Sequence, residues 1–129
     1  MTALELKSPR DGSILTFRVV TQYAQEVEFE VSVRTPWFTG RAPASTFMNG
    51  SPSTMFKAMA QEWQGWKEPK SWQDLERRVS LSSLTDSTGH VSITVELIGQ
   101  DYESRLCVVL EYEAGQLEEM ALATAELLG

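Results

Sequence analysis

The chain has one histidine and one cysteine, so His90 with Cys107 is the one thiol–imidazole pair that could supply a nucleophile. Both residues lie in expected strands, and the expected register places Cys107 beside Thr94, four positions from His90. Four residues of extended chain span ~13 Å, which is too far for a hydrogen bond. Cys107 is therefore interpreted as a small strand residue, and the chain also lacks the nucleophile-elbow motif of serine hydrolases.

His90 follows the turn residue Gly89 and is expected at the start of a strand, with its side chain between Leu84 and Glu111. In that position it would pair with a carboxylate at the edge of a sheet, or it would form a pH-responsive contact with a partner. A zinc site needs several His or Cys ligands, and the chain has one of each. No GxGxxG or phosphate-loop motif is present either, so the sequence predicts no metal and no cofactor.

Carboxylates are plentiful, and a pair of them could in principle cleave a glycosidic bond. Glu26, Glu28 and Glu30 alternate with apolar residues, as on the solvated face of a strand. Glu118 and Glu119 lie where a helix is expected to begin, and negative charge is favourable there. Both groups have structural explanations, so no catalytic residue is predicted.

Three of the four tryptophans fall within residues 62–72, in the segment EWQGWKEPKSW. One interpretation is structural: Trp66 and Trp72 fold the loop between them over the end of the core, each burying up to ~200 Å². The other interpretation is a binding site, in which Trp66 and Trp72, with Trp37, line an aromatic recess for a sugar or a cation. We favour the first, because SWQD predicts a short helical turn that would direct Trp72 toward Trp63.

The composition restricts the class of partner. The 129 residues include 18 acidic and 11 basic side chains, for a formal charge of −7. Binding to nucleic acid depends on Lys and Arg that neutralise phosphates, so nucleic acid and anionic membranes are expected to be poor partners and a basic protein a better one. A single cysteine forms no intrachain disulfide, no signal peptide is recognised, and no apolar run approaches the ~20 residues that span a bilayer. We expect a cytoplasmic protein.

The N-terminal part of the chain predicts strands. Residues 14–35 read as strand, turn and strand, and Leu4 with Leu6 suggests a short edge strand before them. Because the apolar rows must share one face, we expect Phe17 opposite Phe29, with Arg18 opposite Glu28 on the other face. Residues 35–50 contain Pro and Gly and are expected to be irregular.

A change of period then predicts a helix between Ser51, a credible N-cap, and Gly65. Its apolar stripe comprises Met55, Phe56, Met59, Ala60 and Trp63. Residues 77–113 read as a three-stranded meander, in which the expected register aligns Val79 with Val95 and Leu106, and Arg78 with Glu96 and Arg105. Residues 114–129 predict an amphipathic helix.

These elements, in the order β-β-β-α-β-β-β-α, predict one α+β domain over residues 1–129. We expect a single antiparallel sheet of about six strands with two helices packed on one face, and a polar, wet reverse face.

Four segments, WQGW, SWQDLE, GHVSITVEL and EYEAGQLEEMA, follow one another in an order that resembles a family of small, uncharacterised bacterial domains of unknown function. Its members share Trp-x-Gly-Trp, Trp-x-x-Leu-Glu, Gly-His-Val and Gly-x-x-Leu segments. Within residues 47–128 the matching positions are Trp63, Gly65, Trp66, Trp72, Leu75, Glu76, Gly89, His90, Val91, Gly115 and Leu117. The resemblance implies a single α+β domain, carries no reaction, and singles out Glu76 and His90 as polar positions in a structural pattern.

The first functional hypothesis is a non-enzymatic protein-interaction module. Its wet sheet face, bearing Glu26, Glu28, Glu30 and Glu96, would dock a basic protein partner, and association would be fast and salt-sensitive. By analogy alone, such a small acidic protein looks like the immunity proteins that neutralise toxins. An exposed edge strand would also allow a homodimer.

The alternative hypothesis is a small-ligand binding domain or an enzyme. A sugar or metabolite would then be held in one pocket by Trp37, Trp66, Trp72, Glu76 and His90. Tryptophan exposure separates the two hypotheses, since a structural role hides the rings and a site leaves one face open.

Overall fold

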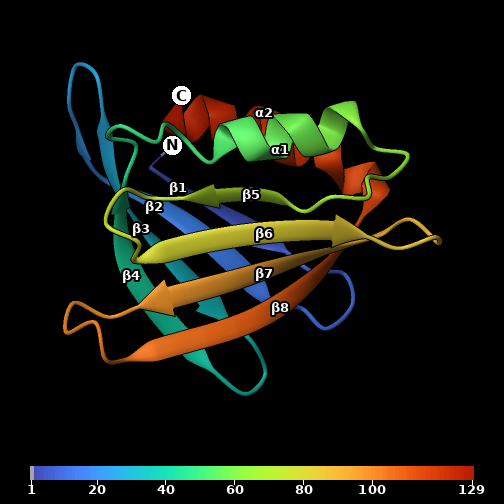
Figure 1. Cartoon of the computed structure of the whole chain (residues 1–129), viewed down its shortest axis with the longest axis horizontal. Coiled ribbons are helices and arrows are strands. Elements are labelled where there is room, and N and C mark those ends of the chain that lie inside the picture. Colours follow the sequence, from blue (N-terminus) through green and yellow to red (C-terminus); the bar gives the residue numbers. More distant parts are fainter. Residues whose placement is uncertain (1) are drawn as a thin grey trace.

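The protein is built from two antiparallel sheets and two helices, as seen in a computed structural model that describes residues 2–129 (Figure 1). One sheet has the strand order β1-β2-β3-β4 and the other β5-β6-β7-β8. The elements are β1 (Ala3–Lys7), β2 (Ile14–Gln22), β3 (Val27–Arg34), β4 (Thr39–Ser45), α1 (Ser53–Gln61), β5 (Lys70–Gln73), β6 (Val79–Thr85), β7 (His90–Ile98), β8 (Arg105–Glu113), the short 3-10 helix η1 (Ala114–Gln116) and α2 (Leu117–Leu128).

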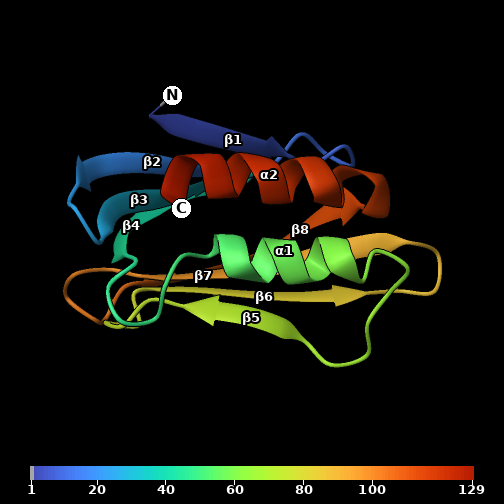
Figure 2. The ribbon, with the colours of Figure 1, turned by 90° about the horizontal axis from the view of Figure 1, so that it is seen from above.

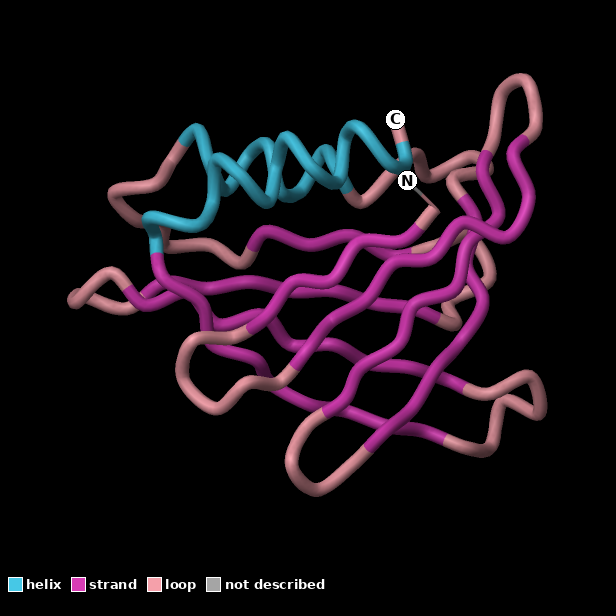
Figure 3. The backbone as a smooth tube through the Cα atoms, turned by 180° about the vertical axis from the view of Figure 1, so that it is seen from behind, coloured by secondary structure: helices cyan, strands magenta, loops and turns pink. Residues whose placement is uncertain are grey.

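The two sheets turn their apolar faces toward each other. Strand β4 lies against β6 and β7, and the strands of the two sheets cross obliquely when seen from behind (Figure 3). The helices pack on each other and cover the open side, with α2 beside β1 and α1 beside β5 (Figure 2). Inside, the Phe17 ring lies 6.2 Å from Phe29 and 6.1 Å from Phe56, which joins α1 to the first sheet.

The expected α+β class and antiparallel pairing are confirmed, but the single six-stranded sheet is wrong. Two further strands, β4 and β5, complete two sheets of four strands each within residues 2–129. Each sheet has one apolar face, and alternation along a strand cannot say whether a second sheet or a helix covers that face.

Strand β4 lies in the segment expected to be irregular because of its Pro and Gly. Pro43 is tolerated because β4 is an edge strand. By the alternation of the β3–β4 ladder, the backbone nitrogen of residue 43 points away from β3, so no hydrogen bond is lost there. Gly40 allows close packing, because a Cβ there would collide with the end of the Leu106 side chain of β8, which would have to move. Both residues therefore fit a strand at the seam between two sheets.

The expected register is wrong by two residues in both sheets, while the faces are right. Phe17 lies opposite Val31, and a bulge follows Val19 before the turn to β3. In the second sheet Val79 lies opposite Leu97. Shifting one strand by two residues keeps each side chain on its own face of the sheet, so the expected burial could not distinguish these registers. In a hairpin the geometry of the turn fixes the register instead. Arg18 consequently pairs with Glu30 at 2.8 Å.

The predicted row of Arg78, Glu96 and Arg105 forms only in part. Arg105 lies 3.8 Å from Glu96, whereas Arg78 pairs with Glu76 at 2.7 Å.

The helices keep most of their expected buried residues. In α1, Met55, Phe56 and Met59 are buried, and Ser51 accepts a hydrogen bond from the Ser53 backbone at its start. Trp63 was expected on the same stripe, but α1 ends at Gln61 and the Trp63 side chain is 58% exposed. In α2, the buried residues are Leu117, Met120, Thr124, Leu127 and Leu128.

Trp66 and Trp72 are buried and fasten the segment between α1 and β6. The indole N–H of Trp66 donates to the Ser83 carbonyl at 3.0 Å, and that of Trp72 donates to the Gly50 carbonyl at 3.0 Å. The expected helical turn at SWQD is wrong, because these residues form β5 and Trp72 pairs with Leu81. The structural interpretation of the two rings is nevertheless right, since each is less than a tenth exposed.

Substituting either buried tryptophan should destabilise the protein. Trp66→Phe or Trp72→Phe removes an indole donor and leaves a carbonyl without its partner, so we expect the free energy of unfolding to fall by roughly 1–3 kcal/mol. Trp63→Phe is the matched control, because its ring is largely in water, and it should change stability by less than about 0.5 kcal/mol. Urea unfolding of the three variants measures this; equal effects at positions 63, 66 and 72 would contradict the assignment.

Candidate functional site

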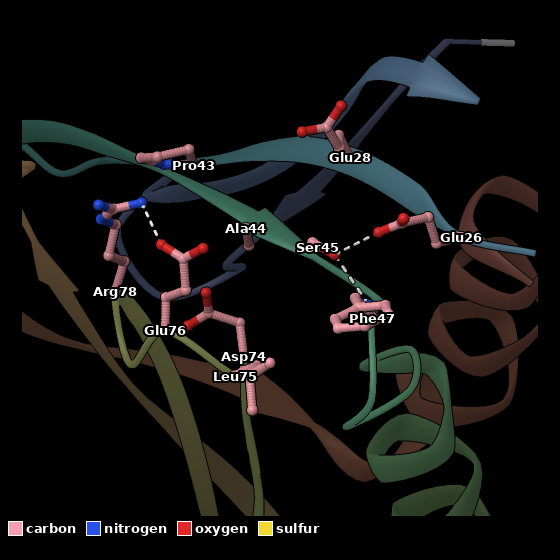
Figure 4. A pocket seen from close by; sticks show the side chains of 10 residues that line it. All are labelled: Glu26, Glu28, Pro43, Ala44, Ser45, Phe47, Asp74, Leu75, Glu76 and Arg78. Atoms are coloured by element: carbon pink, nitrogen blue, oxygen red, sulfur yellow. Dashed lines mark hydrogen bonds and ion pairs between the residues drawn. The ribbon is translucent and has the colours of Figure 1, made fainter. Parts of the chain in front are cut away.

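A cavity of about 250 Å³ opens at the seam between the two sheets (Figure 4). One wall comes from the start of β3 and from β4 with the residues after it, and the other from the turn between β5 and β6. The lining residues are Glu26, Glu28, Pro43, Ala44, Ser45, Phe47, Asp74, Leu75, Glu76 and Arg78. Four carboxylates and one guanidinium therefore share a small space, which we call the acidic cavity.

The β5–β6 turn is shaped by Asp74, whose side chain is only 4% exposed. One of its carboxylate oxygens accepts a hydrogen bond from the Val79 backbone at 2.9 Å. Arg77 has the left-handed backbone conformation that this tight turn requires, with φ at 61°. Burial raises the pKa of Asp74 above its ordinary value, although the backbone donor of Val79 opposes that shift.

Glu76 and Arg78 form an ion pair at the rim of the same turn. The Arg78 Nη1 lies 2.7 Å from the Glu76 carboxylate, and the guanidinium lies 5.1 Å from the centre of the Tyr102 ring. The Tyr102 hydroxyl donates to the Glu76 carbonyl at 3.2 Å, and Arg78 Nε is buried with no hydrogen-bond partner among residues 2–129. Arg78 is thus held mainly by one carboxylate and one aromatic face.

On the opposite wall the acids accept hydrogen bonds from hydroxyl groups. Glu26 accepts from the Ser45 hydroxyl at 3.1 Å, and Glu28 accepts from the Tyr23 hydroxyl at 2.7 Å. A hydroxyl donor leaves the negative charge in place, so this wall adds to the acidity of the cavity. The mouth also carries apolar surface, because Phe47 is 51% exposed and Leu75 is 47% exposed.

The four acids expected to form one docking face are divided by the structure. Glu26 and Glu28 line the acidic cavity, whereas Glu30 lies 2.8 Å from Arg18 and 4.0 Å from Arg41. Glu96 belongs to β7 in the other sheet. The single-sheet prediction had placed all four on one surface, and the second sheet separates them.

The residues of the alternative aromatic pocket are not brought together. Trp66 and Trp72 are buried, whereas Trp37 is 85% exposed in the turn between β3 and β4. Glu76 precedes β6 and His90 follows it, so these two lie at opposite ends of that strand. Of the five residues, only Glu76 lines the acidic cavity.

His90 lies opposite Glu113, not between Leu84 and Glu111 as expected, and it is surrounded by carboxylates. Its Nδ1 is 3.2 Å from Asp86 and 3.7 Å from Glu111, and its Nε2 is 3.7 Å from Glu113. The hydrogen bond with Asp86 is the main reason that the pKa of His90 is raised. Cys107 is exposed and lies opposite Glu96, six residues along β7 from His90, so the two form no catalytic pair.

A larger hollow of about 650 Å³, which we call the helix groove, lies between α1 and α2. Its lining is mostly apolar, with Ala60, Trp63, Ala121 and Leu122 prominent, and it includes one lysine and one glutamate. Of these two hollows, only the acidic cavity is lined by several charges of one sign, so it is the candidate site.

Sequence reasoning missed Asp74, Ser45, Phe47 and Arg78 as members of the site. Because strand β4 was not predicted, the second wall of the cavity had no expected position, and Asp74 had been assigned to the short helical turn expected at SWQD. One available signal was the pair of acids Asp74 and Glu76 on either side of Leu75, directly before the paired basic residues Arg77 and Arg78.

The titration of His90 gives a test of its surroundings. Because its pKa is raised above the ordinary value of 6.5, its contribution to stability is fully present below that pH and is lost as the pH rises through the folded-state pKa. Asp86→Asn should lower the pKa of His90, and Glu103→Gln should leave it unchanged. NMR titration of the imidazole protons measures both, and a wild-type pKa at or below 6.5 would contradict the described geometry.

Two kinds of feature are absent from residues 2–129. No group of three or more His, Cys, Asp or Glu side chains there is arranged to hold a metal ion. Neither helix in this part of the chain combines the length and apolarity needed to cross a membrane.

Comparison with known proteins gives one match. Neither the curated proteins nor the solved structures include a match to this chain. A model of the family of unknown function DUF6228 matches residues 6–129, a longer stretch than the 47–128 over which the four segments suggested a resemblance. Over almost its whole length, therefore, the chain belongs to the family of unknown function DUF6228.

Proposed function

We propose that the protein is a non-enzymatic interaction module that binds a basic protein partner through the acidic cavity and its rim. The observation that carries this proposal is the lining of one cavity by Glu26, Glu28, Asp74 and Glu76 from two sheets, with Arg78 as the one basic residue in that lining. Such a cluster attracts any cation that can enter.

The rim supports a protein partner over a simple ion. Phe47 and Leu75 expose apolar surface beside the carboxylates, and interfaces combine such apolar surface with a charged surround. The formal charge of −7 adds a long-range field that would steer a basic protein toward this surface. Glu30 and Glu96 are each paired with an arginine, so they would add little to that field.

Three of the cavity carboxylates give no support to catalysis. Glu26 and Glu28 are held by the hydroxyl groups of Ser45 and Tyr23, and Glu76 is held by Arg78. Each is fixed as a charged acceptor, which suits recognition of a cation. The analogy with immunity proteins, which are small acidic proteins that bind toxins, is consistent with this role and remains an analogy.

Charge removal at the cavity should weaken binding to basic peptides. We expect Glu28→Gln with Glu76→Gln to lower the affinity for an oligo-lysine peptide and an oligo-arginine peptide by about tenfold or more, or roughly 1.4 kcal/mol. The double variant Glu103→Gln with Glu126→Gln changes the net charge equally, and should cost less than about threefold. Calorimetric titration at about 50 mM salt measures the affinities.

The same titration at about 500 mM salt gives the second arm of this test, because screening should weaken an electrostatic complex. Affinity that does not change with salt, or equal losses in the cavity and control variants, would overturn the proposal.

Small-ligand binding is a second candidate function, and the helix groove favours it. A hollow of about 650 Å³ falls within the range that accommodates small molecules, and Trp63 offers an open ring face there. This candidate position differs from the one around Trp66 and Trp72 that the sequence suggested.

A screen of flat apolar fragments tests the helix groove through tryptophan fluorescence. Trp63→Ala should abolish saturable quenching by any fragment that binds there, and Trp37→Ala, which removes the other exposed indole, should preserve it. Retained quenching in Trp63→Ala would exclude the groove as the binding position.

A further inference from the structure

We propose that the turn between β3 and β4 docks on the surface of an anionic lipid bilayer, with the rings of Trp37 and Phe38 inserted among the lipid headgroups. This turn lies at the opposite end of β4 from Ser45 and Phe47 of the acidic cavity. The inference therefore goes beyond the proposed function and does not depend on it.

The turn carries two neighbouring aromatic rings that the fold does not bury. Trp37 is 85% exposed and Phe38 is 60% exposed. Figures 1 and 3 show the β3–β4 turn projecting from the lower edge of the molecule, on the side away from the two helices. Two open rings on one projecting turn gain free energy when a partner removes them from water.

The turn holds its shape without help from these rings. The Thr35 hydroxyl accepts hydrogen bonds from the backbone N–H groups of Trp37, at 3.2 Å, and Phe38, at 2.9 Å. The Thr35 backbone N–H donates to the Phe38 carbonyl at 2.8 Å. Because backbone groups and one threonine define the turn, the rings are presented in a preformed arrangement, and docking loses little conformational entropy.

The outer face of the first sheet is basic where it meets this turn. The strand register gives two rows across that face: Lys7, Ile14, Arg34 and Thr39 nearest the turn, then Glu5, Thr16, Ser32 and Arg41. Both rows point outward, because the row between them includes the buried residues Leu6, Leu15 and Val33. Three basic side chains and one acidic side chain therefore stand behind the aromatic rings.

These basic groups are available to an outside partner. Lys7 and Arg34 take part in no ion pair within residues 2–129. Arg41 is 75% exposed and lies 4.0 Å from Glu30, which has its closer contact with Arg18 at 2.8 Å. An anionic surface would supply the partners that this end of the sheet lacks.

The acidic surplus of the chain lies mostly elsewhere. The β1–β2 turn, at the same end of the sheet, adds Arg10 and Asp11, whose charges have opposite sign. The acidic cavity is at the other end of β4, and Glu118 and Glu119 belong to α2, on the far side of the molecule in Figure 1. Charges separated by more than roughly 8 Å are largely screened at physiological salt, so the local charge decides how this turn meets a surface.

A bilayer fits this turn better than a folded protein does. A stable protein interface buries about 800 Å² on each partner, and two side chains on a narrow turn supply only part of that area. A convex turn would also need a matching pocket on a protein, whereas fluid headgroups close around it. Tryptophan is enriched at the headgroup level of membranes, and nearby basic residues add attraction to anionic lipids.

The test is binding of the full chain to two kinds of vesicle, one of phosphatidylcholine alone and one with about a third phosphatidylglycerol. Flotation measures the bound fraction, and a blue shift of tryptophan emission reports entry of an indole into the headgroup region. We expect the partition coefficient to be at least about tenfold higher for the anionic vesicles, and to fall between about 50 and about 500 mM salt.

Two double variants locate the contact. Trp37→Ala with Phe38→Ala removes two exposed side chains, should abolish the blue shift, and should lower the partition coefficient by about tenfold or more. Lys7→Gln with Arg34→Gln should lower it by about tenfold for the anionic vesicles only.

The controls are matched in residue type and exposure. Trp63→Ala removes the other largely exposed indole near the helices, and Lys57→Gln with Lys67→Gln removes two exposed, unpaired basic groups. Each control should change the partition coefficient by less than about twofold.

The other outcomes count against the inference. No binding to the anionic vesicles, or equal binding to both kinds, would overturn it, and binding that survives loss of Trp37 and Phe38 would place the contact on another surface. If soluble polyglutamate binds through Lys7 and Arg34 while vesicles do not bind, the turn recognises an acidic protein and the bilayer is wrong. None of these results bears on the oligo-lysine titration, so the proposed function is judged separately.

Discussion

Each sheet of this protein has one face that cannot remain in water, and the fold depends on burying those two faces against each other. Neither sheet could be stable alone, because four strands with one uncovered apolar face need a second layer. The second sheet supplies that layer near β4, β6 and β7, and the helix pair supplies it on the open side. Phe17 shows the connection directly, since its ring contacts both Phe29 in the same sheet and Phe56 in α1.

The acidic cavity follows from the way in which these layers meet. Two twisted sheets that cross obliquely cannot stay in contact along their whole edges, and they separate where β4 passes the β5–β6 turn. Side chains at such a seam are half-buried, so the low polarity of the core lies directly beside water. Asp74 occupies this boundary, because it lines the cavity and is nevertheless only 4% exposed. The position of the candidate site is thus a consequence of sheet geometry as much as of the local residues.

The sequence predicted the faces of the strands well because alternation is local. Phe17, Phe29, Val79 and Val95 were expected on apolar rows, and all four are buried. Register and sheet number were not predictable in the same way, because a shift of two residues preserves every face and because a second sheet covers an apolar row as well as a helix does. Pro43 and Gly40 led to a wrong interpretation of β4, since edge position and the contact with Leu106 are tertiary facts. For the site, the sequence singled out Glu26 and Glu28 for the docking face and Glu76 for the alternative pocket. The three line one cavity only because β4 forms part of its wall, and β4 was not predicted.

The meander order of both sheets has a consequence for how the chain folds. All six strand pairs in residues 2–129 join strands that follow each other in sequence, so each sheet requires only short loops to close. Contacts between the sheets, by contrast, join distant parts of the chain. During synthesis, β1 to β4 leave the ribosome before any strand of the sheet that will cover them. Until β8 and α2 have been made, the nascent N-terminal half has no second sheet to cover its apolar face, and exposed apolar surface of this kind favours aggregation.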